Sequence, residues 1–152
     1  MRFIRWTVAV AAAAMLLAGS ALAEDRGSPD EAKALVEKAA AHLQAVGPEK
    51  AFADFNDQKG AFVDRDLFVF VYSLDGKVVV GGAVPALLGR SALAFKDIDG
   101  KEFGKEIMAA AAAGGGWTEY RMSNPATKKP EPKKTYAVKA GDYVVAAGAY
   151  VP

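Results

Sequence analysis

Five aromatic side chains on three extended segments have the chemistry of a binding-pocket wall. They are Phe70 and Tyr72, Trp117 and Tyr120, and Tyr136. A site for a small molecule needs apolar walls and a few directed polar groups, and the polar ends of Tyr and Trp favour half-wet positions. Aromatic residues on a sheet are also ordinary core residues, so the sequence leaves both a pocket and a packed core open.

An acidic stretch offers a second chemistry, calcium binding. If Gly100 takes the sixth position of a calcium loop, Asp97, Asp99 and Glu106 fall at the third, fifth and twelfth positions. The first position is then Phe95, which cannot ligate a cation. Capping of a following helix by Asp99 is therefore the favoured interpretation.

No other pattern indicates catalysis, a metal or a cofactor. The chain has no cysteine, which excludes thiolate metal sites, c-type haem attachment and cysteine nucleophiles. His42 is the only histidine and lies on an apolar helix stripe, so we expect a satisfied residue at the edge of the core. No nucleophile elbow is present, and Gly114–Gly116 lacks the lysine and spacing of a phosphate loop. We expect a protein that is not an enzyme and has no cofactor.

Two helices are predicted ahead of the extended segments. Ser28 and Glu31 can form a capping box around Pro29, and an apolar stripe at helical spacing follows until Gly47. A shorter amphipathic helix then runs to about residue 56. The first helix is long enough to cover one face of a sheet.

Five strands are predicted to hold the aromatic residues. They are Leu67–Leu74, Lys77–Gly82, Trp117–Met122, Thr135–Lys139 and Tyr143–Val151. The first is apolar on both faces, so it should lie inside the sheet, and Asp75-Gly76 should form a hairpin turn after it. The links are mostly short, which favours an antiparallel sheet and an α+β domain.

A lid is predicted between the second and third strands. Residues 83–98 have no clean period and indicate a long loop with a short helical turn. A helix should begin at Asp99 and bury Phe103, Ile107 and Ala111. A second loop, rich in Pro and Lys, is predicted over 124–134.

The first 23 residues have the layout of a cleavable signal peptide. Arg2 and Arg5 precede a 13-residue uncharged run, and Ala21 and Ala23 supply the small residues of a cleavage site. The run is shorter than the roughly 20 residues of a membrane span. An uncleaved N-terminal anchor is the alternative. We expect residues 24–152 to be a single periplasmic or secreted domain with no later membrane span.

The charge balance excludes some partners. The chain has 19 Lys and Arg against 18 Asp and Glu, and removing the signal leaves 17 against 18. A near-neutral domain argues against nucleic acid or an anionic membrane as the main partner.

Residues 24–152 resemble the single Cache domain, an extracytoplasmic sensor module related in shape to PAS domains. The matching stretches, in order, are AxxLVEKA at 32–39, GPEKAF at 47–52, DLFVFVYSLDG at 66–76, VPALLGR at 84–90, KDIDGKEF at 96–103, GWTEY at 116–120, NP at 124–125, EPKKTY at 131–136 and GAY at 148–150. The resemblance implies a curved sheet that binds a small molecule on one face, under the loop and helix that follow the second strand.

The resemblance also implies a ligand class and an anchor for it. Ligands of such domains are often small carboxylates, amino acids or similar metabolites, and a carboxylate needs a cation or backbone donors. Lys133 matches the lysine of the family's proline-lysine-to-tyrosine stretch and is the first choice, with Arg121 and Arg90 as alternates. The neighbouring lysines leave a solvated loop as the other interpretation of Lys133.

Two functions follow from these observations. The first is non-catalytic binding of a small metabolite in the periplasm for sensing or uptake. The second is a protein-interaction module that docks on a membrane-bound kinase, transporter or redox protein. Most family members are tethered to a kinase or chemoreceptor by a second membrane helix. The sequence contains no such tether, so we expect a standalone exported form.

Overall fold

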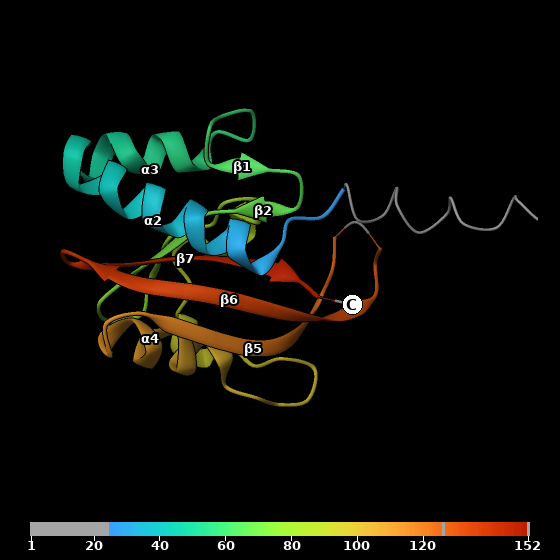
Figure 1. Ribbon diagram of the computed structural model, residues 1–152. Coiled ribbons are helices and arrows are strands. Elements are labelled where there is room, and N and C mark those ends of the chain that lie inside the picture. Colours follow the sequence, from blue (N-terminus) through green and yellow to red (C-terminus); the bar gives the residue numbers. More distant parts are fainter. Residues whose placement is uncertain (1–24, 126, 152) are drawn as a thin grey trace, which may run out of the picture.

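The computed structural model describes residues 25–125 and 127–151, which form a sheet with helices on both faces (Figure 1). The predicted signal peptide, residues 1–23, lies outside the described residues.

The two N-terminal helices form as predicted. They are α2, Pro29–Val46, and α3, Pro48–Asn56. The capping box is complete: the Glu31 N–H donates to the Ser28 hydroxyl at 3.2 Å, and the Ser28 N–H donates to the Glu31 carboxylate at 2.7 Å. His42 lies 2.7 Å from Asp54, so it links α2 to α3 at the edge of the core.

The described residues form a five-stranded sheet in which all neighbouring strands are antiparallel. The strands are β3, Phe70–Ser73; β4, Val78–Val80; β5, Gly116–Ser123; β6, Pro130–Ala140; and β7, Tyr143–Tyr150. Their spatial order is β4-β3-β7-β6-β5, so β3 is an interior strand and β7 is the middle one. The α+β class and the five-stranded sheet are confirmed.

Two strand boundaries differ from the prediction. The segment expected as one strand is divided at Val69: β2, Leu67–Phe68, pairs with β1, Val63–Asp64, in a separate hairpin, and β3 continues into the main sheet. Strand β6 begins at Pro130, inside the segment predicted as a loop. Pairing with both β5 and β7 overrides the weak strand propensity of its Pro and Lys residues.

The sheet separates two apolar cores. Helices α2 and α3 cover one face, while α4, Phe103–Ala112, and the short 3-10 turns η1, Pro85–Leu87, and η2, Ala92–Ala94, cover the other (Figure 1). This second layer is the predicted helix and loop lid.

Helix α4 starts later than predicted. It begins at Phe103 after Glu102, and no side chain caps it, so the expectation of a cap by Asp99 is wrong. Asp97 organises this region instead, because its carboxylate accepts the N–H groups of Asp99 and Lys101, each at 2.9 Å. The result is a closed turn that leads from the lid loop into the helix.

Helix α4 packs against the η2 backbone at Gly104, where there is no room for a side chain. A Cβ on Gly104 would lie 1.8 Å from the carbonyl oxygen of Ala92. Backbone cannot yield as a flexible side chain can, so Gly104→Ala should lower the free energy of unfolding by at least about 2 kcal/mol in guanidinium denaturation. Lys105→Ala, an exposed change in the same turn, should cost under about 1 kcal/mol. Equal stability of both variants would contradict this packing.

Candidate ligand-binding site

A cavity of about 560 Å³ lies between the sheet and the lid, on the face opposite α2. Its walls are mostly apolar and aromatic. The lining residues are Phe68, Phe70, Tyr72, Val78, Gly81, Val84, Leu87, Arg90, Ala94, Phe95, Lys96, Phe103, Tyr120, Met122, Ser123, Pro125, Lys133 and Tyr150. The size falls within the range of small-molecule sites.

Four of the six residues predicted for the site line this cavity. Phe70 and Tyr72 project from β3, Tyr120 from β5 and Lys133 from β6. Alternate residues of a strand share a face, which places Phe70 and Tyr72 together. Tyr120 and Lys133 are partners in the β5–β6 register, so they reach the same face from neighbouring strands.

Trp117 and Tyr136 do not line the cavity, which corrects the expectation that all six residues share one pocket. Each lies three positions from a lining residue of its own strand, and an odd separation points to the opposite face. Their rings meet at 5.0 Å there, and the Lys33 ammonium of α2 lies 5.2 Å from the Tyr136 ring. They belong to the α2 side of the sheet.

The two alternate anchors, Arg90 and Arg121, also differ in whether they reach the cavity. Arg90 lines the cavity from the exposed lid, with its guanidinium 5.8 Å from the centre of the Phe95 ring. Arg121 is not among the lining residues and pairs with Asp99 at 3.5 Å.

Tyr150 and Phe68 line the cavity although sequence reasoning did not select them. Tyr150 is the partner of Lys133 in the β6–β7 register. Counting outward from the predicted turn at Gly141-Asp142 would have paired these two residues, but β6 was expected to start only after Lys133. Phe68 lies two residues before Phe70, and it packs on the same side of the sheet as Phe70 and Tyr72.

Lys133 is the most unusual residue of the site. It is only 5% exposed, and its ammonium lies 4.8 Å from the centre of the Phe68 ring and 4.9 Å from that of Tyr150. Among the described residues it has neither a hydrogen-bond partner nor an ion-pair partner. Burial lowers the pKa of Lys133 to about 8, and the negative field of Asp66 opposes that shift. The solvated-loop interpretation of this residue is therefore wrong.

Three tyrosines line the cavity together with the lysine, and they differ in the partners of their hydroxyl groups. The Tyr120 hydroxyl shares a hydrogen bond with Thr135 at 2.8 Å, and that of Tyr150 donates to the Ser123 carbonyl at 3.1 Å. Tyr72 has no such partner in the described part of the chain. Burial raises the pKa of all three phenols, that of Tyr150 to about 12, so each stays neutral and can donate a hydrogen bond.

The charges around the cavity have one sign. Lys133 lies at its floor and Arg90 and Lys96 in its lid, while no carboxylate is among the described lining residues. Such a site favours an anion with an apolar part.

The carboxylates of the acidic stretch next to the lid already have partners within the protein. Asp97 accepts three backbone N–H groups, including that of Arg121 at 3.0 Å, and Glu106 pairs with Lys101 at 3.1 Å. Within residues 25–125 and 127–151, no three His, Cys, Asp or Glu side chains cluster to hold a metal ion.

A family model, single Cache domain 2, matches residues 8–152. The chain belongs to the single Cache domain family. As a Cache domain it is a ligand-sensing module of the kind found in chemoreceptors and sensor kinases, and such modules are extracytoplasmic. None of the helices in the described ranges has the length and hydrophobicity to cross a membrane.

Solved Cache-type structures have the same fold. A methyl-accepting chemotaxis protein from Vibrio parahaemolyticus superposes with a TM-score of 0.69 at 19% identity, covering 80% of this chain and 86% of that one. A Cache chemosensory domain described as recognising carboxylic acids gives 0.67 at 20% identity, covering 81% and 92%.

A sequence relative is the sensor histidine kinase MctS from Rhizobium johnstonii. It is 32% identical over 89 residues, which are 57% of this chain and 19% of the kinase. The chain therefore matches less than a fifth of that kinase.

The buried ammonium predicts an unusual pH dependence of stability. Because the pKa of Lys133 is near 8 in the folded state and 10.5 in the unfolded state, the unfolded state binds more protons between these values. The free energy of unfolding should therefore rise with pH from 8 to about 9.5, below the range in which the tyrosines titrate. In Lys133→Met this rise should be lost, and the variant should be more stable at pH 7 by on the order of 1–3 kcal/mol.

Lys134→Met is the matched control. Lys134 is the next residue of β6, but it lies over the Trp117 ring on the opposite face. The Lys134→Met variant should keep the rise in the free energy of unfolding above pH 8. Parallel pH profiles for Lys133→Met and the parent protein would contradict the burial of a charged Lys133.

Proposed function

We propose that this Cache domain binds a small carboxylate in the lid-covered cavity and reports its presence to a signalling partner. The observation that carries the proposal is the ammonium of Lys133, buried in an aromatic cavity without a partner among the described residues. A buried unpaired charge costs stability, and an anionic ligand would remove that cost by pairing with it.

The cavity offers each part of such a ligand a matching surface. The carboxylate pairs with Lys133. The hydroxyl of Tyr72, which has no partner among the described residues, is a further donor that lines the same cavity. The apolar part packs against Phe70 and Phe103, and Arg90 attracts the anion at the entrance. A charge-assisted hydrogen bond contributes about 1.5–3 kcal/mol, and it is stronger where water is excluded.

The volume favours a carboxylate with a sizeable tail. A cavity of about 560 Å³ is larger than a two-carbon acid fills, so a branched, aromatic or longer aliphatic acid would bury more of its apolar surface. The similar chemosensory domain that recognises carboxylic acids supports the ligand class at the level of the fold.

The signalling part of the proposal rests on the family and on the N-terminal sequence. A cleaved signal over residues 1–23 would deliver residues 24–152 to the periplasm. The partner would be a membrane-bound kinase, chemoreceptor or transporter, consistent with the sensor histidine kinase among the relatives. No catalytic role is proposed for any residue.

Direct titration tests the ligand class. In calorimetry at pH 6.5, the purified protein should bind at least one of propionate, hexanoate and benzoate, and it should not bind the corresponding amides. Lys133→Met should lower the affinity at least about tenfold, because the ligand loses the one buried cation among the described residues. Lys134→Met and Trp117→Phe should bind like the parent, since both residues lie on the other face of the sheet. Full affinity in Lys133→Met would overturn the site.

The pH dependence of binding is a second test. Only the protonated amine attracts a carboxylate, so affinity should be constant from pH 6 to 7 and fall about tenfold per pH unit well above 8. Lys133→Arg, whose guanidinium stays charged, should bind with no such fall between pH 8 and 10. A flat profile in the parent protein would show that Lys133 does not anchor the ligand.

A further inference from the structure

Tyr72 brings a second polar group to the cavity wall. The residue is only 4% exposed, and its hydroxyl has no hydrogen-bond partner among the described residues. The hydroxyls of Tyr120 and Tyr150, by contrast, are already bonded within the protein. A buried donor without an acceptor is costly, so its retention at Tyr72 needs an explanation.

The register of the sheet separates this hydroxyl from the ammonium of Lys133. Tyr72 on β3 pairs with Val144 on β7, and Val144 pairs with Lys139 on β6. Lys133 lies six residues before Lys139 on the same strand. At about 3.3 Å per residue, the backbone of Lys133 is therefore roughly 20 Å along the sheet from the row that contains Tyr72.

The ring of Phe70 lies between the two polar groups. Its centre is 6.0 Å from the Lys133 ammonium and 5.4 Å from the centre of the Tyr72 ring. The ammonium is closer to the rings of Phe68 and Tyr150, at 4.8 and 4.9 Å, and Phe68 precedes Phe70 on the side away from Tyr72. One small molecule that crosses the Phe70 ring can therefore reach both groups.

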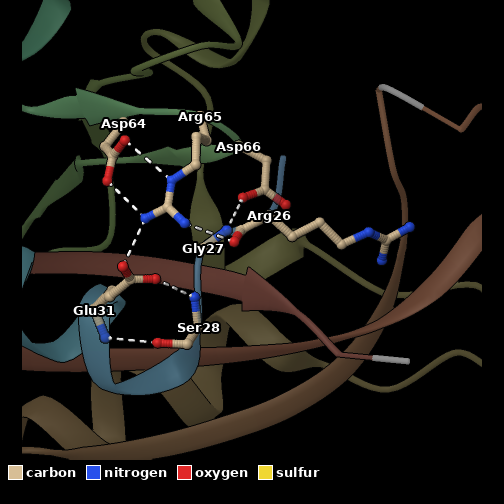
Figure 2. A network of polar contacts seen from close by, with 7 residues as sticks. All are labelled: Arg26, Gly27, Ser28, Glu31, Asp64, Arg65 and Asp66. Atoms are coloured by element: carbon tan, nitrogen blue, oxygen red, sulfur yellow. Dashed lines mark hydrogen bonds and ion pairs between the residues drawn. The ribbon is translucent and has the colours of Figure 1, made fainter. Parts of the chain in front are cut away.

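Asp66 has the other unpartnered polar atom, Oδ2, but this residue is not among those that line the cavity. Figure 2 shows its carboxylate in a polar network at the start of α2, where Oδ1 accepts the N–H of Gly27 at 2.6 Å. Of the described residues that line the cavity, the buried ones with an unpartnered polar group are thus Lys133 and Tyr72.

We propose that Tyr72 is a specificity-determining residue: its hydroxyl donates a hydrogen bond to an uncharged oxygen of the ligand, across the Phe70 ring from the ligand's carboxylate. The ligand is then a carboxylic acid with an oxo, ether or hydroxyl oxygen remote from its acid group. This inference rests on the proposed function for the position of the carboxylate at Lys133, and it adds the second oxygen.

An uncharged oxygen fits the Tyr72 end of the cavity better than a second carboxylate or a purely apolar tail. Arg90 is the cation next to this row, because its carbonyl accepts the N–H of Val78, the register partner of Tyr72. Its guanidinium is exposed to solvent, however, so a carboxylate buried against Tyr72 would have no buried cation to pair with. An apolar tail would leave the Tyr72 hydroxyl buried and unpaired.

Calorimetry with matched acids tests this inference. The probes are hexanoate against 5-oxohexanoate, and 4-isopropenylbenzoate against its isostere 4-acetylbenzoate. In the parent protein the remote oxygen should raise the affinity at least about threefold over the hydrocarbon analogue, as expected for an uncharged hydrogen bond. In Tyr72→Phe, which removes only the hydroxyl, this gain should be lost, while hexanoate should bind about as it does to the parent.

Two controls keep the result specific. The oxygen of 2-oxohexanoate lies beside the carboxylate, at the Lys133 end, so Tyr72→Phe should not change its affinity relative to hexanoate. Tyr136→Phe removes a hydroxyl on the other face of the sheet and should retain the gain from the remote oxygen. No gain in the parent, or an equal gain in the parent and in Tyr72→Phe, overturns the role of Tyr72.

A dicarboxylate tests the charge of the second group. Adipate, a six-carbon acid with a second carboxylate, should bind more weakly than 5-oxohexanoate, because its far carboxylate would be buried without a cation. The opposite order would overturn the assignment of an uncharged oxygen.

These outcomes differ from a failure of the proposed function. If none of the acids binds the parent, or if they bind Lys133→Met with full affinity, the carboxylate site fails and this inference fails with it. If the acids bind through Lys133 and the remote oxygen adds no affinity that depends on Tyr72, the proposed function stands and the role of Tyr72 is overturned.

Discussion

The burial of the Lys133 ammonium is the constraint on which the arrangement of the lid side of this domain depends. Lys133 projects from a strand paired on both sides, so its backbone cannot shift to bring the ammonium to solvent. Aromatic faces give part of the lost hydration back through cation–π contacts. The anion site proposed here is thus preorganised, since the cost of burying the charge is met when the domain folds.

The sheet makes this arrangement possible because its two faces lie in different environments. On the α2 side, β-branched and aromatic residues such as Val145 and Phe55 form a dry core. On the lid side, larger side chains leave a space between themselves and α4. Alternation along each strand assigns every residue to one of these environments. A change of register by one residue would move Lys133 into the dry core, so the register of β6 is as important to the site as the lysine itself.

Sequence reasoning predicted the elements well, because their signals are local: a capping box, Gly turns and alternating apolar runs lie within a few residues. Sequence reasoning was less accurate in assigning side chains to one or the other face of the sheet. Trp117 was grouped with Tyr120 although three positions separate them. Lys133 was chosen as the ligand anchor but was expected in a loop rather than on a strand, because Pro and Lys favour loops. Pairing across β5 and β7 decides both, and such contacts are not local.

The contacts of Arg26 and of Val151 have a consequence for a domain that is pulled at its ends. Arg26 is attached to Glu131, and the N–H of Val151 donates to the carbonyl of the adjacent Pro132 at 2.9 Å. Both ends of the described chain are thus attached to neighbouring residues at the start of β6. A pull on either end reaches this short stretch before the rest of the sheet. Tension on either end would therefore reach β6 within two residues of Lys133, the anchor proposed for the ligand.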